Sequence, residues 1–356
     1  MNIKLDILER EHLIGRLKLI ELLERQSPYR DLPDRFERRF SQALNMIPKQ
    51  FREPALAIFG SALYVTKQML EDAWKYVWTV FCERIGNEPR TNDLLILELD
   101  RDLLRDDFYR TNAIVGRLQD NLPFRSAHDI IDTLMQLESG RMNPELSTCL
   151  CEIMNRPYWI LLIDNSISGT SAASEVERIR RIQTLFPPER KPNILVLIQL
   201  ITELAIGELD KTGTEYISAI NIPLSCALKS DSYSIISDAS LVEEMETLCR
   251  WFGDTHVLPT NYRLAQISKQ ENNPNIAAFG FGAMGWNIVT YKNTPNNSLP
   301  ILWFLPPGNA FRPPFERIDS RIGSPWAGRK NWLDRVEKDE KLRNQILEQL
   351  DLNRHN

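Results

Sequence analysis

The feature that most constrains the fold is a continuous run of apolar residues, Tyr158–Ile163, which follows a turn at Arg156-Pro157. An unbroken apolar run of this length, bounded by turns, is typical of a strand buried on both faces of a parallel sheet. Apolar residues then recur with helical spacing over Ala172–Phe186, and a second buried run follows at Ile194–Ile198. Strand, helix and strand at this spacing form a βαβ unit. The sequence therefore predicts an α/β fold with a mostly parallel sheet.

Further elements follow from hydrophobic periodicity and from Pro, Gly and capping residues. Helices are predicted over 5–23, 36–46, 55–59, 65–85, 93–107, 127–137, 240–252 and 331–350, and strands over 217–222, 233–236, 286–291 and 299–304. The length of 356 residues is enough for two domains. We predict a largely helical N-terminal domain over 1–150 for a partner or nucleic acid, the α/β domain over 151–330, and a C-terminal helix over 331–356.

Composition limits the function classes. Lys and Arg number 43 against 48 Asp and Glu, and this net charge of -5 argues against a broad nucleic-acid groove. The five Cys include no CxxC pair, which predicts reduced thiols and a cytoplasmic protein. Cys149 and Cys151 have no second pair to complete a zinc site, so no metal site is predicted there. No apolar run is long enough to span a bilayer, and no membrane partner is expected.

The residues after the first apolar run carry the clearest chemistry. Asp164 and Asn165 end the predicted strand, and a loop of small residues then enters the helix, with Ser168, Gly169, Thr170 and Ser171. Free N–H groups at a helix start and the helix dipole favour a phosphate. The acid just upstream can hold ribose hydroxyls, so the pattern predicts a site for a 5-phosphorylated sugar. The alternative is a polar turn that only caps the helix.

This segment resembles the phosphoribosyl pyrophosphate (PRPP) motif of type I phosphoribosyltransferases. The resemblance implies that Asp164 and Asn165 form the catalytic pair that binds the ribose 2- and 3-hydroxyls, and that residues 168–171 hold the 5-phosphate. It also implies Mg²⁺ together with PRPP or a nucleotide. Asn165 departs from the family pattern, because the second position of the pair is usually acidic. The loop is about one residue short, and no upstream pyrophosphate loop is found where the chain is predicted helical.

A second segment, Asn293–Trp303, follows a glycine-rich stretch and resembles the C-terminal signature of a divergent branch. That branch comprises phosphoribosyltransferase-like proteins of bacterial conflict systems, some of them encoded beside retron reverse transcriptases. The resemblance implies a second ligand-binding loop with Asn293, Thr294, Asn296 and Asn297. The alternative is local turn chemistry, which Asn and Pro favour on their own.

Three functions remain open from the sequence. The first is an enzyme that acts on a ribose-phosphate compound such as PRPP, a nucleotide or NAD, makes or breaks an N-glycosidic bond at C1, and serves as a toxic effector in antiviral (antiphage) defence. The second is a non-catalytic sensor or scaffold that binds a partner such as a reverse transcriptase with its RNA or DNA. The third is a DNA-binding helical domain with a regulatory α/β half. Apolar stripes on the terminal helices pack on their own domain or, alternatively, form a homo-oligomer.

Two other motifs lack their required context. Gly280–Gly285 matches GxGxxG, but strand-like residues follow it where a dinucleotide fingerprint needs a helix. A glycine-rich turn is predicted instead. Ser166 lacks the flanking glycines of a nucleophile elbow, so a hydrolase triad is not predicted.

Overall fold

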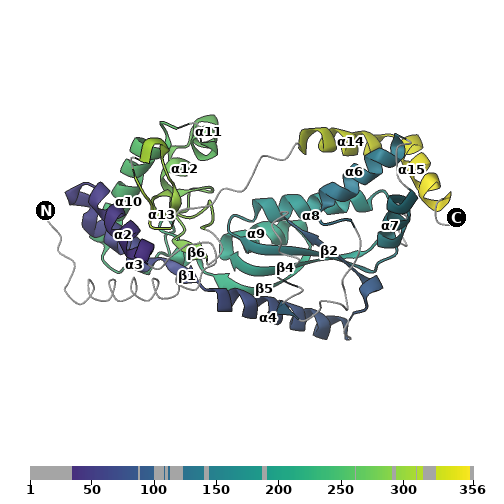
Figure 1. The fold of residues 1–356 in the computed structure, drawn as a ribbon, viewed down its shortest axis with the longest axis horizontal. Coiled ribbons are helices and arrows are strands. Elements are labelled where there is room, and N and C mark those ends of the chain that lie inside the picture. Colours follow the sequence, from purple (N-terminus) through teal and green to yellow (C-terminus); the bar gives the residue numbers. More distant parts are fainter. Residues whose placement is uncertain are drawn as a thin grey trace. The chain divides into compact units, whose positions relative to one another are not determined.

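The chain folds into two compact units, each built from two separate stretches of sequence (Figure 1). The computed structural model describes residues 34–86, 89–99, 108, 111–112, 123–139, 144–186, 191–260, 262–290, 294–309, 311–315 and 326–352. Unit 1 comprises residues 1–70 and 222–320, and unit 2 comprises residues 71–221 and 321–356. Across the described ranges, no helix combines the length and apolar character needed to cross a membrane.

A four-stranded sheet is the centre of unit 2. Its strands are β2 (Leu94–Glu98), β3 (Tyr158–Ser166), β4 (Asn193–Thr202) and β5 (Glu215–Ile222), in the spatial order β2-β3-β4-β5. β3 pairs in parallel with β2 on one side and with β4 on the other. β2 and most of β3 are buried, as expected for strands covered on both faces. The predicted α/β fold with a mostly parallel sheet is confirmed.

Helices cover both faces of this sheet (Figure 1). One face packs against α4 (Lys67–Ile85) and Phe108. The other face packs against six helices: α6 (Ala127–Glu138), α7 (Pro144–Met154), α8 (Thr170–Gln183), α9 (Glu203–Thr212), α14 (Trp326–Lys338) and α15 (Glu340–Leu352). Because the spatial order of the strands follows their order in the chain, crossovers of one hand place α8 and α9 on the same face.

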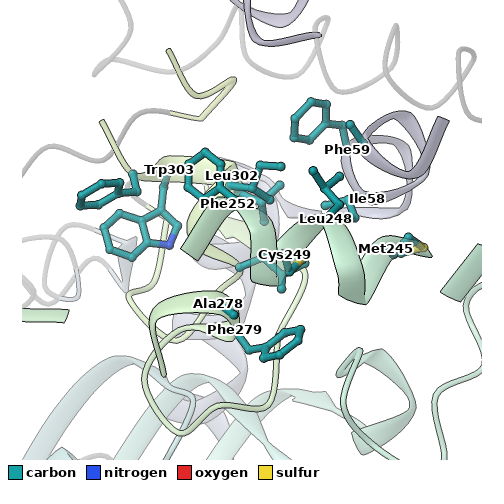
Figure 2. Packing of buried hydrophobic residues seen from close by; sticks show 14 of the residues in the cluster. Ile58, Phe59, Met245, Leu248, Cys249, Phe252, Ala278, Phe279, Leu302 and Trp303 are labelled. Atoms are coloured by element: carbon teal, nitrogen blue, oxygen red, sulfur yellow. The ribbon is translucent and has the colours of Figure 1, made fainter. Parts of the chain in front are cut away.

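Unit 1 is mainly helical. Its helices are α2 (Asp34–Met46), α3 (Arg52–Ser61), α10 (Ala239–Phe252), α11 (Arg263–Gln270), α12 (Pro274–Phe279) and α13 (Pro300–Trp303), and β1 (Leu63–Val65) pairs in parallel with β6 (Ile288–Thr290). Shorter helical turns are η1 (Lys49–Phe51), η4 (Leu224–Cys226), η5 (Gly253–Val257) and η6 (Pro307–Asn309). Figure 2 shows the core of this unit, in which residues of α3, α10, α12 and α13 pack together.

The buried amide of Asn287, the residue before β6, forms hydrogen bonds to α3 in unit 1. The side chain of Asn287 is 3% exposed, and its Nδ2 donates to the carbonyl of Ile58 at 2.7 Å and to Ser61 Oγ at 2.8 Å. We expect Asn287→Ala to lower the free energy of unfolding by about 2 kcal/mol, because it removes two buried hydrogen bonds and leaves the carbonyl of Ile58 with only the longer bond from Ser61 Oγ, at 3.3 Å. Urea unfolding measures this loss. Asn275→Ala, which removes only an exposed bond to Arg250, is the control and is expected to cost less than about 0.5 kcal/mol.

Several predicted elements differ in the structure. The first residues of the helix predicted over 93–107 form the turn η2 (Thr91–Asp93) and strand β2 instead, because the apolar residues after Asp93 pair with β3. Residues 100–107 lie outside the described residues. The strand predicted over 299–304 contains α13: Pro300 starts it, and burial on all sides removes the periodicity that distinguishes helix from strand. Residues 233–236 form no strand. The helix predicted over 5–23 lies outside the described residues.

The boundaries of the two units also differ from the predicted domain boundaries at 150 and 330. Four elements of the predicted helical domain, α4, β2, α6 and α7, lie in unit 2 around its sheet. β2 joins this unit because it pairs with β3, and the helices join it because their apolar faces cover the sheet. The roles assigned to the three predicted segments stay predictions.

Candidate functional site

The predicted acidic pair, Asp164 and Asn165, lies near the end of strand β3. β3 continues three residues past the apolar run, and Asn165 and Ser166 pair with Leu200 and Ile201 of β4. Asp164 and Asn165 are both half-buried. Successive residues of a strand face opposite sides of the sheet, so Asp164 lies on the face covered by α4 and Asn165 lies on the other face. The structure therefore does not bring the two side chains of the pair to one face.

The turn after β3 is bonded to the start of the next helix of the sheet. Thr202 ends β4, and its hydroxyl donates a short hydrogen bond to the carbonyl of Ile167. The same hydroxyl accepts from the N–H of Ala205 at 3.2 Å, which caps α9. The β3–α8 turn and the β4–α9 turn therefore form one hydrogen-bonded structure at the carboxyl ends of the strands.

Gly169 occupies the closest approach in this turn. It has φ +77°, and a Cβ there would lie 2.6 Å from Glu208 Cβ and 2.9 Å from Ala205 Cα. No residue with a side chain fits this position without a shift of α9. Gly169 is also the N-cap of α8, and no side chain in the described ranges caps that helix start. The exposed Thr170 and Ser171 follow, which leaves a helix start suited to an anion.

Two buried polar side chains share a sheet face with Asp164, and neither was predicted from the sequence: Glu98 pairs with Leu162, two residues before Asp164, and Gln199 lies on the other neighbouring strand. Glu98 ends β2 and is 0% exposed, and Gln199 of β4 is 1% exposed. Gln199 lies level with Asp164, because its neighbours pair with Ile163 and Asn165. By strand alternation, Glu98, Asp164 and Gln199 share the face covered by α4. The sequence does contain a signal for Glu98, because this acid directly follows the apolar run of residues 94–97. The signal was missed because a helix was predicted over 93–107.

The second predicted loop lies in unit 1, whereas residues 164–171 lie in unit 2. Thr294 is buried and its hydroxyl donates to the carbonyl of Phe315 at 3.2 Å. Asn297 Nδ2 donates to the carbonyl of Phe281 at 2.8 Å, and the N–H of Phe281 donates to the carbonyl of Asn296 at 3.2 Å. The two bonds with Phe281 join the loop to the glycine-rich turn, and the bond of Thr294 joins it to Phe315. These local bonds favour the alternative of turn chemistry. Asn293 lies outside the described residues.

The glycine-rich stretch is a turn, as predicted, but it lies between the helix α12 and β6, whereas the sequence predicted a turn between two strands. Gly280 has φ +82°, and a Cβ there would lie 2.6 Å from the carbonyl oxygen of Ser298. The turn therefore serves close backbone packing against the amide-rich loop. Ser166, the other residue considered for chemistry, lies buried within β3.

Two thiols and one imidazole outside the site have pKa values that are shifted by burial. Burial raises the pKa of the Cys149 thiol, with further increases from Glu152 and Glu145, and burial also raises the pKa of Cys249. Thiols with raised pKa are poor nucleophiles and poor metal ligands. Burial lowers the pKa of His256, whose ring packs against aromatic rings. No group of three or more His, Cys, Asp or Glu that could hold a metal ion occurs among the residues that the structure describes.

Comparisons with known proteins agree with the resemblance of the sequence. A family model described as PRTase-CE matches residues 49–317, which is more than half of the chain. The matched range includes the β3–α8 turn and the amide-rich loop. No curated protein and no solved structure matches the chain.

Proposed function

Because the chain belongs to the PRTase-CE family and is phosphoribosyltransferase-like, we propose that it binds a ribose 5-phosphate compound at the carboxyl ends of β3 and β4. The ligand is PRPP, a nucleotide or NAD. One observation carries the proposal: the half-buried Asp164 lies two residues before the end of β3, and the glycine turn after the strand starts an uncapped helix. An acid and an anion-binding helix start a few residues apart match the two ends of a ribose phosphate.

Each part of this site has a defined task in the proposal. The N–H groups and hydroxyls at the start of α8, including Thr170 and Ser171, hold the 5-phosphate. The carboxylate of Asp164 accepts hydrogen bonds from the ribose hydroxyls and stabilises the positive charge that develops when the bond at C1 is made or broken. Phosphate binding, remote from C1, supplies energy that positions the sugar.

The residues present are compatible with Mg²⁺ delivered by the ligand. Mg²⁺ is usually held by one or two carboxylates together with substrate phosphates, rather than by an all-protein cage. Asp164 offers one half-buried carboxylate at the end of β3. When bound, Mg²⁺ would neutralise the charge of the pyrophosphate of PRPP, while Asp164 orients the sugar.

A second candidate function is a non-catalytic sensor or scaffold. It is favoured by Asn165, which replaces the usual second acid and lies on the opposite face of the sheet from Asp164. In this case a nucleotide binds without turnover, and the helices bind a partner such as a reverse transcriptase with its RNA or DNA. An effector role in bacterial antiphage defence, in the cytoplasm, is proposed from the sequence resemblance alone.

Ligand binding and turnover separate these functions. PRPP, AMP and NAD are titrated into the full chain with Mg²⁺ by calorimetry, and product formation is followed by phosphorus NMR and chromatography. We expect one of these ligands to bind, with one molecule per chain, and water to replace the leaving group at C1, which releases pyrophosphate from PRPP, adenine from AMP or nicotinamide from NAD. Binding without turnover supports the sensor. If turnover appears only in Asn165→Asp, the loss of catalytic activity is due to Asn165. No binding by any of the three at millimolar concentration rejects both functions.

A further inference from the structure

A cavity of about 480 Å³ lies in unit 2 at the amino ends of the strands. Tyr158, Asn193 and Glu215, which line it, are the first residues of β3, β4 and β5. The candidate site described above lies at the opposite, carboxyl ends of the same strands. The cavity is therefore a separate place in the fold. Its volume is within the range of pockets that bind small organic molecules.

One wall of the cavity is aromatic and aliphatic. The rings of Phe81 and Tyr158 meet edge to face, with their centroids 6.0 Å apart and their planes at 85°. Ile194 and Leu195 of β4 continue this wall. Phe81 is 0% exposed and supports the ring of Tyr158 from behind, so the half-buried Tyr158 and Ile194 are the apolar side chains that a ligand can reach. The accessible part of an aromatic ring suits a flat ligand, because aromatic rings contribute large contact areas at low conformational cost.

A buried hydroxyl in the lining has no partner. The side chain of Thr214 is 7% exposed, and its Oγ1 makes no hydrogen bond to any residue that the structure describes. A buried hydroxyl without a partner carries a free-energy cost, which a ligand with a suitable polar atom removes. The amide of Asn193 is exposed at the same cavity and offers both a donor and an acceptor.

The charged residues in the lining are two Arg and one Glu. Arg84 pairs with Glu215 at 3.3 Å, and Arg180 donates to the carbonyl of Thr212. The carboxyl ends of α4, α8 and α9 also reach the cavity and add partial negative charge. The remaining positive charge is therefore small, and the lining favours a neutral ligand over an anion.

From these observations we infer that the cavity is a second ligand site, for a neutral heteroaromatic molecule of nucleobase or nucleoside size. The ring of Tyr158 contacts the flat face of the ligand, and Thr214 and Asn193 bond its polar edge. The inference rests on the cavity alone and is independent of the function proposed for the carboxyl edge.

The test uses the full chain and the isosteric variant Thr214→Val. Nucleobases and the corresponding nucleosides are titrated at millimolar concentration, and binding is followed by calorimetry and by NMR shifts of the backbone amides of residues 193 and 214. We expect at least one probe to bind, and Thr214→Val to weaken it roughly five- to tenfold while leaving the melting temperature unchanged or slightly higher. A purely structural hydroxyl would instead lower the melting temperature. Bases that bind as tightly as nucleosides identify the ring as the ligand.

Matched variants complete the test. Thr247→Val removes a hydroxyl that donates to Glu243 on an exposed face of α10, and it is expected to leave the affinity unchanged. Asp254→Asn, which changes an exposed carboxylate of unit 1, is expected to leave it unchanged as well. Shifts of the amides of residues 193 and 214, rather than of residues 164–171, distinguish this site from the proposed ribose-phosphate site. The inference is overturned if no probe shifts these two amides, if Thr214→Val binds as tightly as the wild type, or if AMP shifts them at a lower concentration than adenosine does.

Discussion

Replacing Gly169 with alanine is expected to lower the free energy of unfolding by about 3 kcal/mol. About 1–2 kcal/mol comes from forcing a residue with a Cβ into the left-handed backbone at φ +77°. A further 1–3 kcal/mol, roughly, comes from overpacking, because the new Cβ lies 2.6 Å from Glu208 Cβ and 2.9 Å from Ala205 Cα. Urea unfolding followed by circular dichroism measures the loss.

Gly213→Ala is the matched control for this experiment. Gly213 also lies in unit 2 and has φ +60°, but a Cβ there would meet no atom within 4 Å. We expect this variant to lose only the backbone contribution, about 1 kcal/mol. Equal losses in the two variants would contradict the close packing of the β3–α8 turn on α9. If Gly169→Ala stays folded at low temperature, we expect it to bind PRPP or a nucleotide more weakly than the wild type does, because the turn that holds the phosphate must shift.

The centre of the fold could be predicted from the sequence because its strands are buried on both faces. The apolar runs at Tyr158–Ile163 and Ile194–Ile198 need no partner to be identified, and they became β3 and β4. The loop of small residues between them was also identified, but its packing was not. Thr202 and Glu208, which fix and limit that loop, are more than 30 residues away in sequence from it.

The predictions that differ from the structure share a physical cause. Leu94–Glu98 and Pro300–Trp303 are short apolar segments, and a segment buried on every side shows no period that separates strand from helix. The first became a strand because β3 offered it a parallel partner, and the second became a helix in the core of unit 1. Glu98 was missed for the same reason, since only the strand assignment places it on the same face of the sheet as Asp164, on the neighbouring strand.

Asp164→Asn is expected to weaken binding of PRPP or a nucleotide by roughly 100-fold, because it removes the charged partner of the ribose hydroxyls. The fold should be affected little. Asp164 is half-buried, and its Oδ1 accepts from the N–H of Asn165 at 2.7 Å, a bond that an amide oxygen can still make. Calorimetry measures the affinity, and urea unfolding should show a change of less than about 0.5 kcal/mol.

The control for this substitution is Asp254→Asn, which changes an exposed carboxylate of unit 1 by the same atoms and the same charge. If both variants bind as the wild type does, Asp164 does not contact the ligand and the proposed site is wrong. If both lose affinity equally, the ligand responds to the net charge of the chain rather than to one acid. Loss in Asp164→Asn alone, with stability retained, is the result that assigns the ribose to the end of β3, because only local contact separates two substitutions of identical chemistry.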